Sequence, residues 1–297
     1  MKLKHIIAIV PFVLFSCNNG NILNDENSEK ESISNSPNFE LQNKKSQEII
    51  KQIDEKQHVL KTKLKKAKGK SADNLYLEYS KLLNTLIKDL EVNEYNSLSI
   101  YNKWENEIAP DSIQKKMELY DKLQIKIIEN NDGTYNLKYR PGFYYDMFKY
   151  KASKDLREYL KLATLQRKKP IVVNGVINVD WSEISNRLII WEKYIKQNPN
   201  STYKEDAKGK YLELIHLYFY GNKNDRSYSL DNKKIEPQIE QEYLNFVKKY
   251  GKTTTGALTK NYLDYFYTND KNFSSEEFHK KLTEYTNQEI DKEMKKF

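Results

Sequence analysis

Residues 191–212 read WEKYIKQNPNSTYKEDAKGKYL, a pattern typical of two helices joined by a tight turn. Large apolar side chains recur before the turn at helical spacing, at Trp191, Tyr194 and Ile195. Pro199 has no backbone N–H with which to continue the first helix. Thr202 with Glu205 then forms a candidate capping box for the second helix, and the small side chain of Ala207 permits close packing. The segment therefore predicts a helical hairpin.

A weaker copy of this pattern follows later in the chain. It consists of Tyr243, Phe246, Val247, Tyr250, Thr253, Ala257, Tyr262 and Leu263. Gly251 stands at its turn in place of proline, and the polar residues 221–234 between the copies are expected to form a loop. Ahead of the first copy, Asp180 and Glu183 form another candidate capping box. We therefore expect residues 181–297 to be a helical region with repeated hairpins.

Both copies resemble the repeats of tetratricopeptide-type periplasmic lipoproteins, a group of cell-envelope proteins. In that pattern an aromatic helix ends at a turn with proline and serine, and a second helix crosses it closely at an alanine. The resemblance implies helix pairs stacked in an array, with a groove suited to a peptide or protein partner. At least three such pairs are usually needed to close a continuous core, so helices earlier in the chain are expected to add less regular pairs.

Residues 41–123 are expected to form an N-terminal helical region. Apolar side chains recur there at helical spacing in two groups, Ile49, Ile50, Ile53, Leu60 and Leu64, followed by Leu75, Tyr79, Leu82, Leu83, Leu86 and Leu90. Gly69 marks a stop between the two helices. The second stripe continues after an expected break near Asn93. A further helix is expected to begin at a capping box of Asp111 with Gln114.

Residues 124–180 predict a mixed region of hairpins and helix. Apolar and polar side chains alternate on either side of an Asp-Gly pair at residues 132–133, and β-branched residues flank an Asn-Gly pair at residues 174–175. Both patterns are typical of β-hairpins. Ser153 is a candidate N-cap of a helix between them. The expected fold class is therefore mainly α, with helical hairpins in a tetratricopeptide (TPR)-like array and one or two small β-hairpins in the middle.

The amino terminus carries a short apolar segment that ends at Cys17, the only cysteine of the 297 residues. Basic Lys2 and Lys4 precede this segment, which occupies residues 6–15 and is too short to span a bilayer. Residues 14–17, Leu-Phe-Ser-Cys, resemble the lipobox of bacterial lipoproteins.

This resemblance implies that the signal peptidase cuts between Ser16 and Cys17, so that residues 1–16 are a lipoprotein signal peptide. Cys17 would then carry a diacyl lipid containing palmitate, and two or three acyl chains give stable membrane anchoring. An ordinary secretory signal followed by a free thiol, or an uncleaved anchor, are the alternatives. Residues 17–40 are rich in Asn, Ser and Glu, which predicts a disordered tether with a reach of about 25 Å.

The composition fits an exported body behind such an anchor. The lipid on Cys17 would hold the protein at the cell membrane or the outer membrane, with its body in the periplasm. The absence of an aspartate directly after Cys17 favours the outer membrane. Loss of Lys2 and Lys4 lowers the net charge from +8 to +6, a mild balance without the concentrated basic patch that nucleic-acid binding requires. A single cysteine also excludes an internal disulfide.

No residue pattern predicts a catalytic or metal site, and no cofactor is expected. The four histidines are not spaced as a metal pair: His5, His58, His216 and His279. The chain lacks the glycine-rich turns that bind phosphate or dinucleotides, and it lacks the Gly-x-Ser-x-Gly motif of hydrolases. His216 lies in a nearly apolar helical segment and is expected to serve packing. The sequence therefore favours a binding protein over an enzyme.

One segment, residues 139–148 with the sequence YRPGFYYDMF, is unusually aromatic for a scaffold. Tyrosine and arginine often anchor protein interfaces, so this segment is a candidate partner-binding surface. Its expected contact residues are Tyr139, Arg140, Phe143, Tyr144 and Tyr145. The alternative is that these rings fill the junction between the first hairpin and the helices.

Two functions of different kinds fit these observations. The favoured one is a membrane-anchored, non-catalytic scaffold or adaptor that binds another protein of the cell envelope. The alternative is an inhibitor or immunity lipoprotein that blocks a toxin or hydrolase acting in the envelope, with residues 139–148 as its plug. A cell-wall enzyme is the least favoured option, because no pair of carboxylates stands out as a glycosidase site.

Replacing Cys17 by serine tests the expected anchor. Cys17→Ser removes the acylated thiol, so we expect the loss of labelled palmitate and release of the protein from the membrane fraction. Metabolic labelling followed by fractionation measures both. Ser28→Ala, in the expected tether, is the matched control. A Cys17→Ser protein that still sediments with membranes would contradict the lipid anchor.

Overall fold

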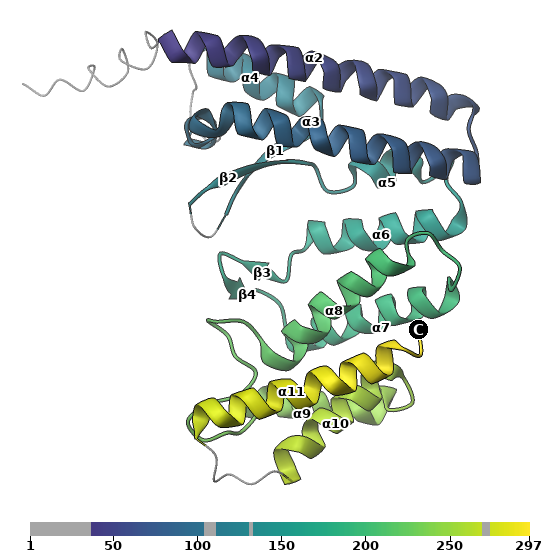
Figure 1. The fold of residues 1–297 in the computed structure, drawn as a ribbon, viewed down its shortest axis with the longest axis vertical. Coiled ribbons are helices and arrows are strands. Elements are labelled where there is room, and N and C mark those ends of the chain that lie inside the picture. The colour runs from purple at the N-terminus through teal and green to yellow at the C-terminus, as the bar shows by residue number, and fades with distance from the viewer. Residues whose placement is uncertain (1–36, 104–110, 131–132, 269–273) are drawn as a thin grey trace, which may run out of the picture. The chain divides into compact units, whose positions relative to one another are not determined.

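The computed structural model of the chain describes residues 37–103, 111–130, 133–268 and 274–297. These residues are largely helical and include two small antiparallel hairpins, which confirms the expected fold class (Figure 1). The chain divides into two units, Met1–Lys44 and Lys45–Phe297, and the core lies within the second. The expected lipobox and Cys17 lie outside the described residues.

The described part of the N-terminal region contains three helices: α2 (Pro37–Lys66), α3 (Lys70–Lys103) and α4 (Asp111–Lys122). The predicted apolar stripes of α2 and α3 are buried, and their fully enclosed members include Ile53, Leu60, Leu83 and Leu90. Gly69 lies between these helices in the left-handed conformation, which glycine adopts without strain. Residues 37–40 are helical although the sequence assigned them to the tether, because proline suits the first helical turn. The side chain of Asp111 lies outside the described residues.

The break expected near Asn93 does not occur, since α3 continues without interruption from Lys70 to Lys103. The side-chain amide of Asn93 donates to the carbonyl oxygen of Asp89, one turn earlier, at 2.6 Å. Fully buried Leu98 extends the apolar stripe beyond this point. Packing of the stripe therefore outweighs the weak helix propensity of asparagine.

The residues described in the middle of the chain form two short hairpins and two helices: β1 (Ile125–Glu129), β2 (Tyr135–Tyr139), α5 (Phe143–Phe148), α6 (Lys154–Lys168), β3 (Val172–Val173) and β4 (Val176–Ile177). The strands pair as predicted, in two separate two-stranded sheets. Asn174 and Gly175 both have positive φ, as a two-residue hairpin turn requires. Ser153 caps α6 as predicted, because its hydroxyl accepts the Leu156 N–H at 3.4 Å.

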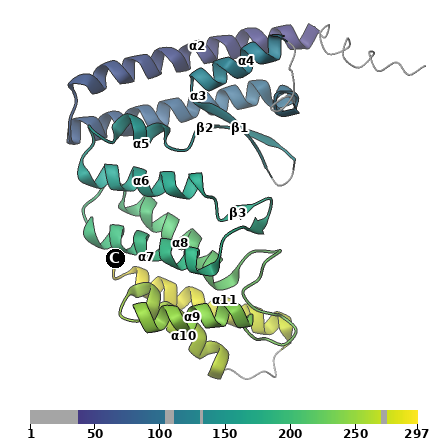
Figure 2. The same ribbon diagram turned by 180° about the vertical axis from the view of Figure 1, so that it is seen from behind.

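Outside residues 269–273, which the structure does not describe, the C-terminal region contains five helices: α7 (Trp181–Gln197), α8 (Lys204–Tyr220), α9 (Pro237–Tyr250), α10 (Thr254–Thr268) and α11 (Ser275–Met294). The pairs α7 with α8 and α9 with α10 are the two predicted helical hairpins, and α11 lies beside the second pair (Figures 1 and 2). Ala207, expected at the first close crossing, is fully buried. Residues 221–236 form the loop between the hairpins. The architecture is therefore repeat-like, as expected.

Two predicted capping boxes are wrong in their hydrogen bonds: Asp180 with Glu183, and Thr202 with Glu205. At the start of α7, the Glu183 carboxylate accepts from Arg187 at 2.9 Å instead of reaching back to the cap. At the start of α8, the cap position falls on Tyr203, without a side-chain bond. The cause is tertiary, because the hydroxyl of Ser201 accepts the Tyr203 N–H and donates to Asp155 of α6.

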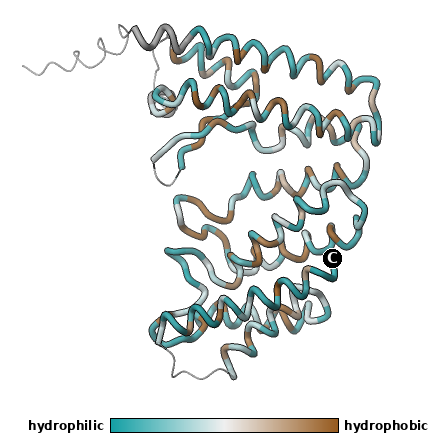
Figure 3. The backbone as a smooth tube through the Cα atoms, in the orientation of Figure 1, coloured by the Kyte–Doolittle hydropathy of each residue, from teal (hydrophilic) through white to brown (hydrophobic). Residues whose placement is uncertain are grey.

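Buried apolar side chains form two clusters, one from residues 49–160 together with Tyr203 and one from residues 171–290. Tyr159 of α6 packs against both clusters. Its ring stacks on Tyr203 at 5.2 Å between centroids and meets Trp191 edge-on at 6.0 Å. Apolar and polar positions are interleaved along the helices, as burial of one helix face requires (Figure 3). Helix α6 therefore joins the two clusters.

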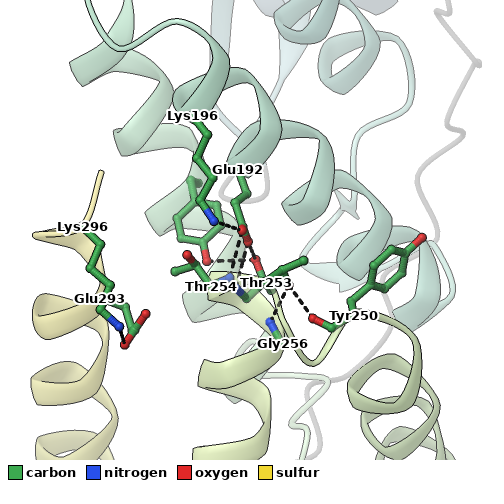
Figure 4. A network of polar contacts seen from close by, with 10 residues as sticks. Glu192, Lys196, Tyr250, Thr253, Thr254, Gly256, Glu293 and Lys296 are labelled. Carbon is green, nitrogen blue, oxygen red and sulfur yellow. Dashed lines mark hydrogen bonds and ion pairs between the residues drawn. The ribbon is translucent and has the colours of Figure 1, made fainter.

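A buried carboxylate connects the two helical hairpins (Figure 4). Glu192 of α7 is 3% exposed and accepts from the backbone N–H groups of Thr254 and Thr255, at 2.9 and 2.8 Å. The Thr255 hydroxyl and the Lys196 ammonium also donate to it, each at 2.6 Å. These bonds satisfy N–H groups that a helix leaves free in its first turn. Glu192 thus caps a helix of the neighbouring hairpin.

Gly256 allows α9 and α10 to approach closely. A Cβ atom at this position would lie 2.0 Å from the carbonyl oxygen of Tyr250, so a larger residue requires the turn to shift. The Gly256 N–H donates to the Thr253 hydroxyl at 3.0 Å, and that hydroxyl donates to the Tyr250 carbonyl at 2.7 Å. The turn expected around Gly251 is therefore held by side-chain hydrogen bonds.

Replacing Glu192 by alanine is expected to lower the free energy of unfolding by about 3 kcal/mol, because buried N–H groups lose their acceptor. Burial alone raises the pKa of Glu192, but hydrogen bonds from Lys196 and Thr255 outweigh burial and lower the pKa below its usual value. The carboxylate therefore contributes its full stability above about pH 4.5. That contribution is lost as the pH falls through the lowered native pKa.

Urea unfolding at neutral and at acid pH measures this contribution. The difference between wild type and Glu192→Ala should be largest at neutral pH and should narrow in acid. Glu118→Ala, on the exposed side of α4, is the matched control and should change the free energy of unfolding by less than about 0.5 kcal/mol. A Glu192→Ala protein as stable as wild type at neutral pH would refute the capping role.

Candidate functional site

A cleft runs along α6 and consists of two adjoining open cavities. The first has a volume of about 500 Å³ and lies among α3, β2, α5 and α6. The second has a volume of about 680 Å³ and lies among the first hairpin, the end of α6, β3 and α8. The cavities share four lining residues: Lys138, Tyr139, Ala163 and Arg167. We call this pair of cavities the α6 cleft.

The amino-terminal turn of α6 is bonded to elements of both clusters. The Ser153 N–H donates to Asp73 of α3 at 3.0 Å. Asp155 accepts from Ser201, in the turn between α7 and α8, at 2.9 Å, and its backbone carbonyl accepts from the Tyr194 hydroxyl at 3.2 Å. Burial raises the pKa of Asp155, but hydrogen bonds from Ser153 and Ser201 outweigh it and lower the pKa. An ionised Asp155 thus fixes this turn, and the cleft-lining residues of α6 follow it.

Tyrosine rings make up much of the wall of the first cavity. Five of its described lining residues are tyrosines: Tyr76, Tyr139, Tyr144, Tyr145 and Tyr159. Tyr76 meets Tyr144 edge-on at 5.5 Å between centroids, and Tyr144 meets Tyr139 at 5.7 Å. Burial, helped by the charge of Asp206, raises the pKa of Tyr76 to about 12. The cavity therefore offers rings and neutral hydroxyl groups at physiological pH.

Two charged side chains bond to the backbone of β2 within the cleft. The Leu137 N–H donates to the Glu91 carboxylate of α3 at 2.8 Å, and the Arg167 guanidinium of α6 donates to the Tyr139 carbonyl oxygen. An edge strand with free N–H and C=O groups is a template for another strand, and charged side chains commonly block it. An extended peptide can therefore pair with this edge of β2 only by displacing these side chains.

The cations of the cleft are only partly compensated. Lys88 and Lys138 are exposed and make no ion pair with any described residue. Arg167 is also exposed, and its bond goes to a neutral carbonyl, which leaves its charge uncompensated. Arg187, in the second cavity, is 3% exposed and ion-paired with Glu183 at 2.9 Å. Three accessible positive charges thus remain in the described lining.

The carboxylates of the described cleft lining are fewer than its cations. Glu91 accepts from a neutral N–H of β2, which leaves its charge uncompensated, whereas Glu213 is paired with Lys210 at 2.9 Å. Glu129, at the second cavity, is exposed and has no ion pair within the described residues. The described lining of the α6 cleft therefore carries more unpaired positive than negative charge, which favours a ligand with an acidic group.

Of the five residues predicted to bind a partner, some are buried or ion-paired within the protein and others line the first cavity. Tyr139 and Phe143 are buried and stack on each other at 4.0 Å, and Arg140 pairs with a carboxylate of α4. Tyr144 and Tyr145 are half-buried and line the first cavity. Most rings of this segment fill the junction between the first hairpin and the helices, which is the alternative that the sequence left open.

Sequence reasoning missed the residues that complete the cleft. Tyr76 and Tyr159 lie on predicted helices, but no local pattern indicates that their rings line one cavity. Lys138 did have a signal, because alternation along β2 places it on the face opposite buried Leu137. Arg167, near the end of α6, had none.

The remaining residues considered in the sequence analysis are the histidines, the possible metal ligands, and the predicted cleavage and lipidation positions. His216, expected to serve packing, is exposed on α8 and stacks on Tyr220 at 5.9 Å between ring centroids. In the part of the chain that the structure describes, no three His, Cys, Asp or Glu side chains are placed to hold a metal ion. Ser16 and Cys17, the predicted cleavage and lipidation positions, lie outside that part.

Comparisons with family models, with curated proteins and with solved structures find no match to this chain. Among the described helices, none is both long enough and apolar enough to cross a bilayer. The function proposed for the protein therefore rests on its own residues.

Removing the Glu91 carboxylate is expected to free the edge of β2. Glu91→Ala leaves the Leu137 N–H without its acceptor, so hydrogen exchange of that amide with solvent should become at least about tenfold faster. NMR-detected exchange measures the rate at this single amide. Glu129→Ala, at the exposed end of β1, is the control and should leave the rate unchanged. Equal protection of Leu137 in Glu91→Ala and wild type would show that the bond has no such role.

Proposed function

We propose that this protein is a membrane-anchored lipoprotein that acts as a non-catalytic adaptor of the cell envelope and binds a polypeptide segment of its partner in the α6 cleft. The observation that carries this proposal is the lining of the cleft, where tyrosine rings lie beside the edge of β2 and beside unpaired cations. A polypeptide segment offers matching groups, namely apolar side chains, backbone amides and charge.

The dimensions of the cleft support a ligand of this kind. Its cavities, about 500 and 680 Å³, fall within the range of roughly 300–1,000 Å³ that is usual for ligand sites. Because the two cavities share lining residues, one continuous segment can occupy both. Tyrosine and arginine, which dominate the energetic hot spots of interfaces, are both present in the lining.

Anchoring through Cys17 would bring the cleft to its partners. The proposed lipid holds the protein at the cell membrane or the outer membrane, and the proposed tether, shortened to residues 17–36 by the start of α2, gives the periplasmic body a reach of about 25 Å. Repeat-like helical architectures commonly present grooves to peptide and protein partners. The anchor and the cleft thus serve one role, which is to hold an envelope protein close to the membrane.

The alternative, an inhibitor or immunity lipoprotein, has less support. Its plug was expected from residues 139–148, and the rings of Tyr139, Phe143 and Phe148 are buried in the core. A plug needs exposed anchoring side chains that insert into a pocket of the target. A hollow cleft suits a protein that receives a segment better than a protein that inserts one.

Photo-crosslinking in intact cells tests the adaptor function. A benzophenone amino acid replaces Asn84 in the first cavity or Gln166 in the second, and Lys260, exposed on α10, is the control position. Both cleft positions are expected to trap the same partner polypeptide upon irradiation, and the control position should trap none. Equal products at all three positions, or none at either cleft position, would argue against a polypeptide ligand.

A further inference from the structure

Two lysines face each other across the first hairpin. Strands β1 and β2 pair with Lys126 directly opposite Lys138, and both residues are exposed. Side chains at opposite positions lie on the same face of the sheet with Cβ atoms about 4.5–5.5 Å apart, and like charges there are destabilising. Neither lysine has an ion pair within the described residues. An anion beside this pair would relieve the repulsion.

Lys138 also belongs to the α6 cleft, where it lines both cavities. Arg167 lines both cavities from α6, and Lys88 lines the first cavity from α3. The described carboxylates of the lining offset only part of this charge, because Glu213 is paired with Lys210 and only Glu91 and Glu129 keep an uncompensated charge. Cations from three separate elements therefore surround the same space.

We propose that the α6 cleft selects an acidic, extended segment of the partner polypeptide and holds a carboxylate of that segment between Lys138 and Arg167. This inference rests on the proposed adaptor function and specifies the chemistry of the partner. Apolar side chains of the segment contact Tyr76 and Tyr144, and its backbone lies along the edge of β2 after displacing Glu91 and Arg167 from their bonds to that strand. Hydrogen bonds from cations to carboxylates are about twice as strong as neutral ones, so they fix the position of the segment.

A polypeptide fits this cleft better than a densely charged polyanion. Glu91 and Glu129 belong to the same lining and repel closely spaced negative charges. The tyrosine rings and the backbone of β2 favour apolar side chains and amide groups, which a polyanion such as dextran sulfate lacks. The segment that binds therefore carries carboxylates interspersed with apolar residues.

Fluorescence anisotropy of the full-length protein in detergent micelles tests this specificity. The probe is a fluorescein-labelled random copolymer of glutamate and tyrosine. Wild type is expected to bind it with an affinity that falls as salt concentration rises. A copolymer of lysine and tyrosine should not bind. Dextran sulfate, at equal concentration of negative charge, should displace the probe at least about tenfold less effectively than unlabelled glutamate–tyrosine copolymer.

The variant Lys138→Glu separates binding from folding. It should weaken probe binding at least about tenfold, because a cation is lost and a repelling charge is added. It should keep or raise the melting temperature, because glutamate opposite Lys126 converts a like-charge pair into an opposite-charge pair. Lys88→Glu, on α3, is a second cleft variant that should also weaken binding. Lys260→Glu changes the net charge equally, away from the cleft, and should alter affinity less than about twofold.

Three results would each overturn the acidic specificity. They are the absence of probe binding to wild type, equal losses of affinity in Lys138→Glu and Lys260→Glu, and equally effective displacement by dextran sulfate. Position-specific crosslinks at Asn84 and Gln166 would still support the adaptor function in any of these cases. The acidic specificity and the adaptor function can therefore fail separately.

Discussion

The hydrogen bonds that hold the first turn of α6 set the position of the cleft walls. Asp73 bonds this turn from α3, and Asp155 bonds it to Ser201 in the turn between α7 and α8. Within the next turn, Tyr159 stacks on Tyr203 and contacts both hydrophobic clusters. Helix α6 thus connects the two hydrophobic clusters, and the residues after its first turns line the α6 cleft.

Local patterns predicted the elements well wherever one helix face is buried. The stripe through Ile53 and Leu60 is enclosed as expected, since apolar side chains at helical spacing must meet a neighbour. Errors arose where the local sequence permits two outcomes. Asn93 suggested a break, but packing around Leu98 keeps α3 continuous. Thr202 offered a cap, but the bonds of neighbouring Ser201 place the start of α8 one residue later.

The cleft itself was beyond sequence reasoning, because its walls come from elements that are far apart in the chain. The aromatic content of residues 139–148 was visible, but whether each ring is buried depends on α3 and α6, which cover them. The alternation of apolar and polar residues along β2 was enough to predict that Lys138 is exposed. Its position opposite Lys126 could be known only from the register of the hairpin. Electrostatic character was therefore the least predictable property of the site.

The capping of α10 by Glu192 limits how the protein can be shortened. A chain ending at Tyr250 would lose the threonine donors and would expose the Glu192 carboxylate to water, with Lys196 as its donor among the four described bonds. Such a fragment loses the hydrogen bonds that join the two hairpins, in addition to the apolar contacts of the missing helices. Proteolytic cleavage between α9 and α10 would therefore destabilise both hairpins. Fragments for crystallisation or fusion need both hairpins intact.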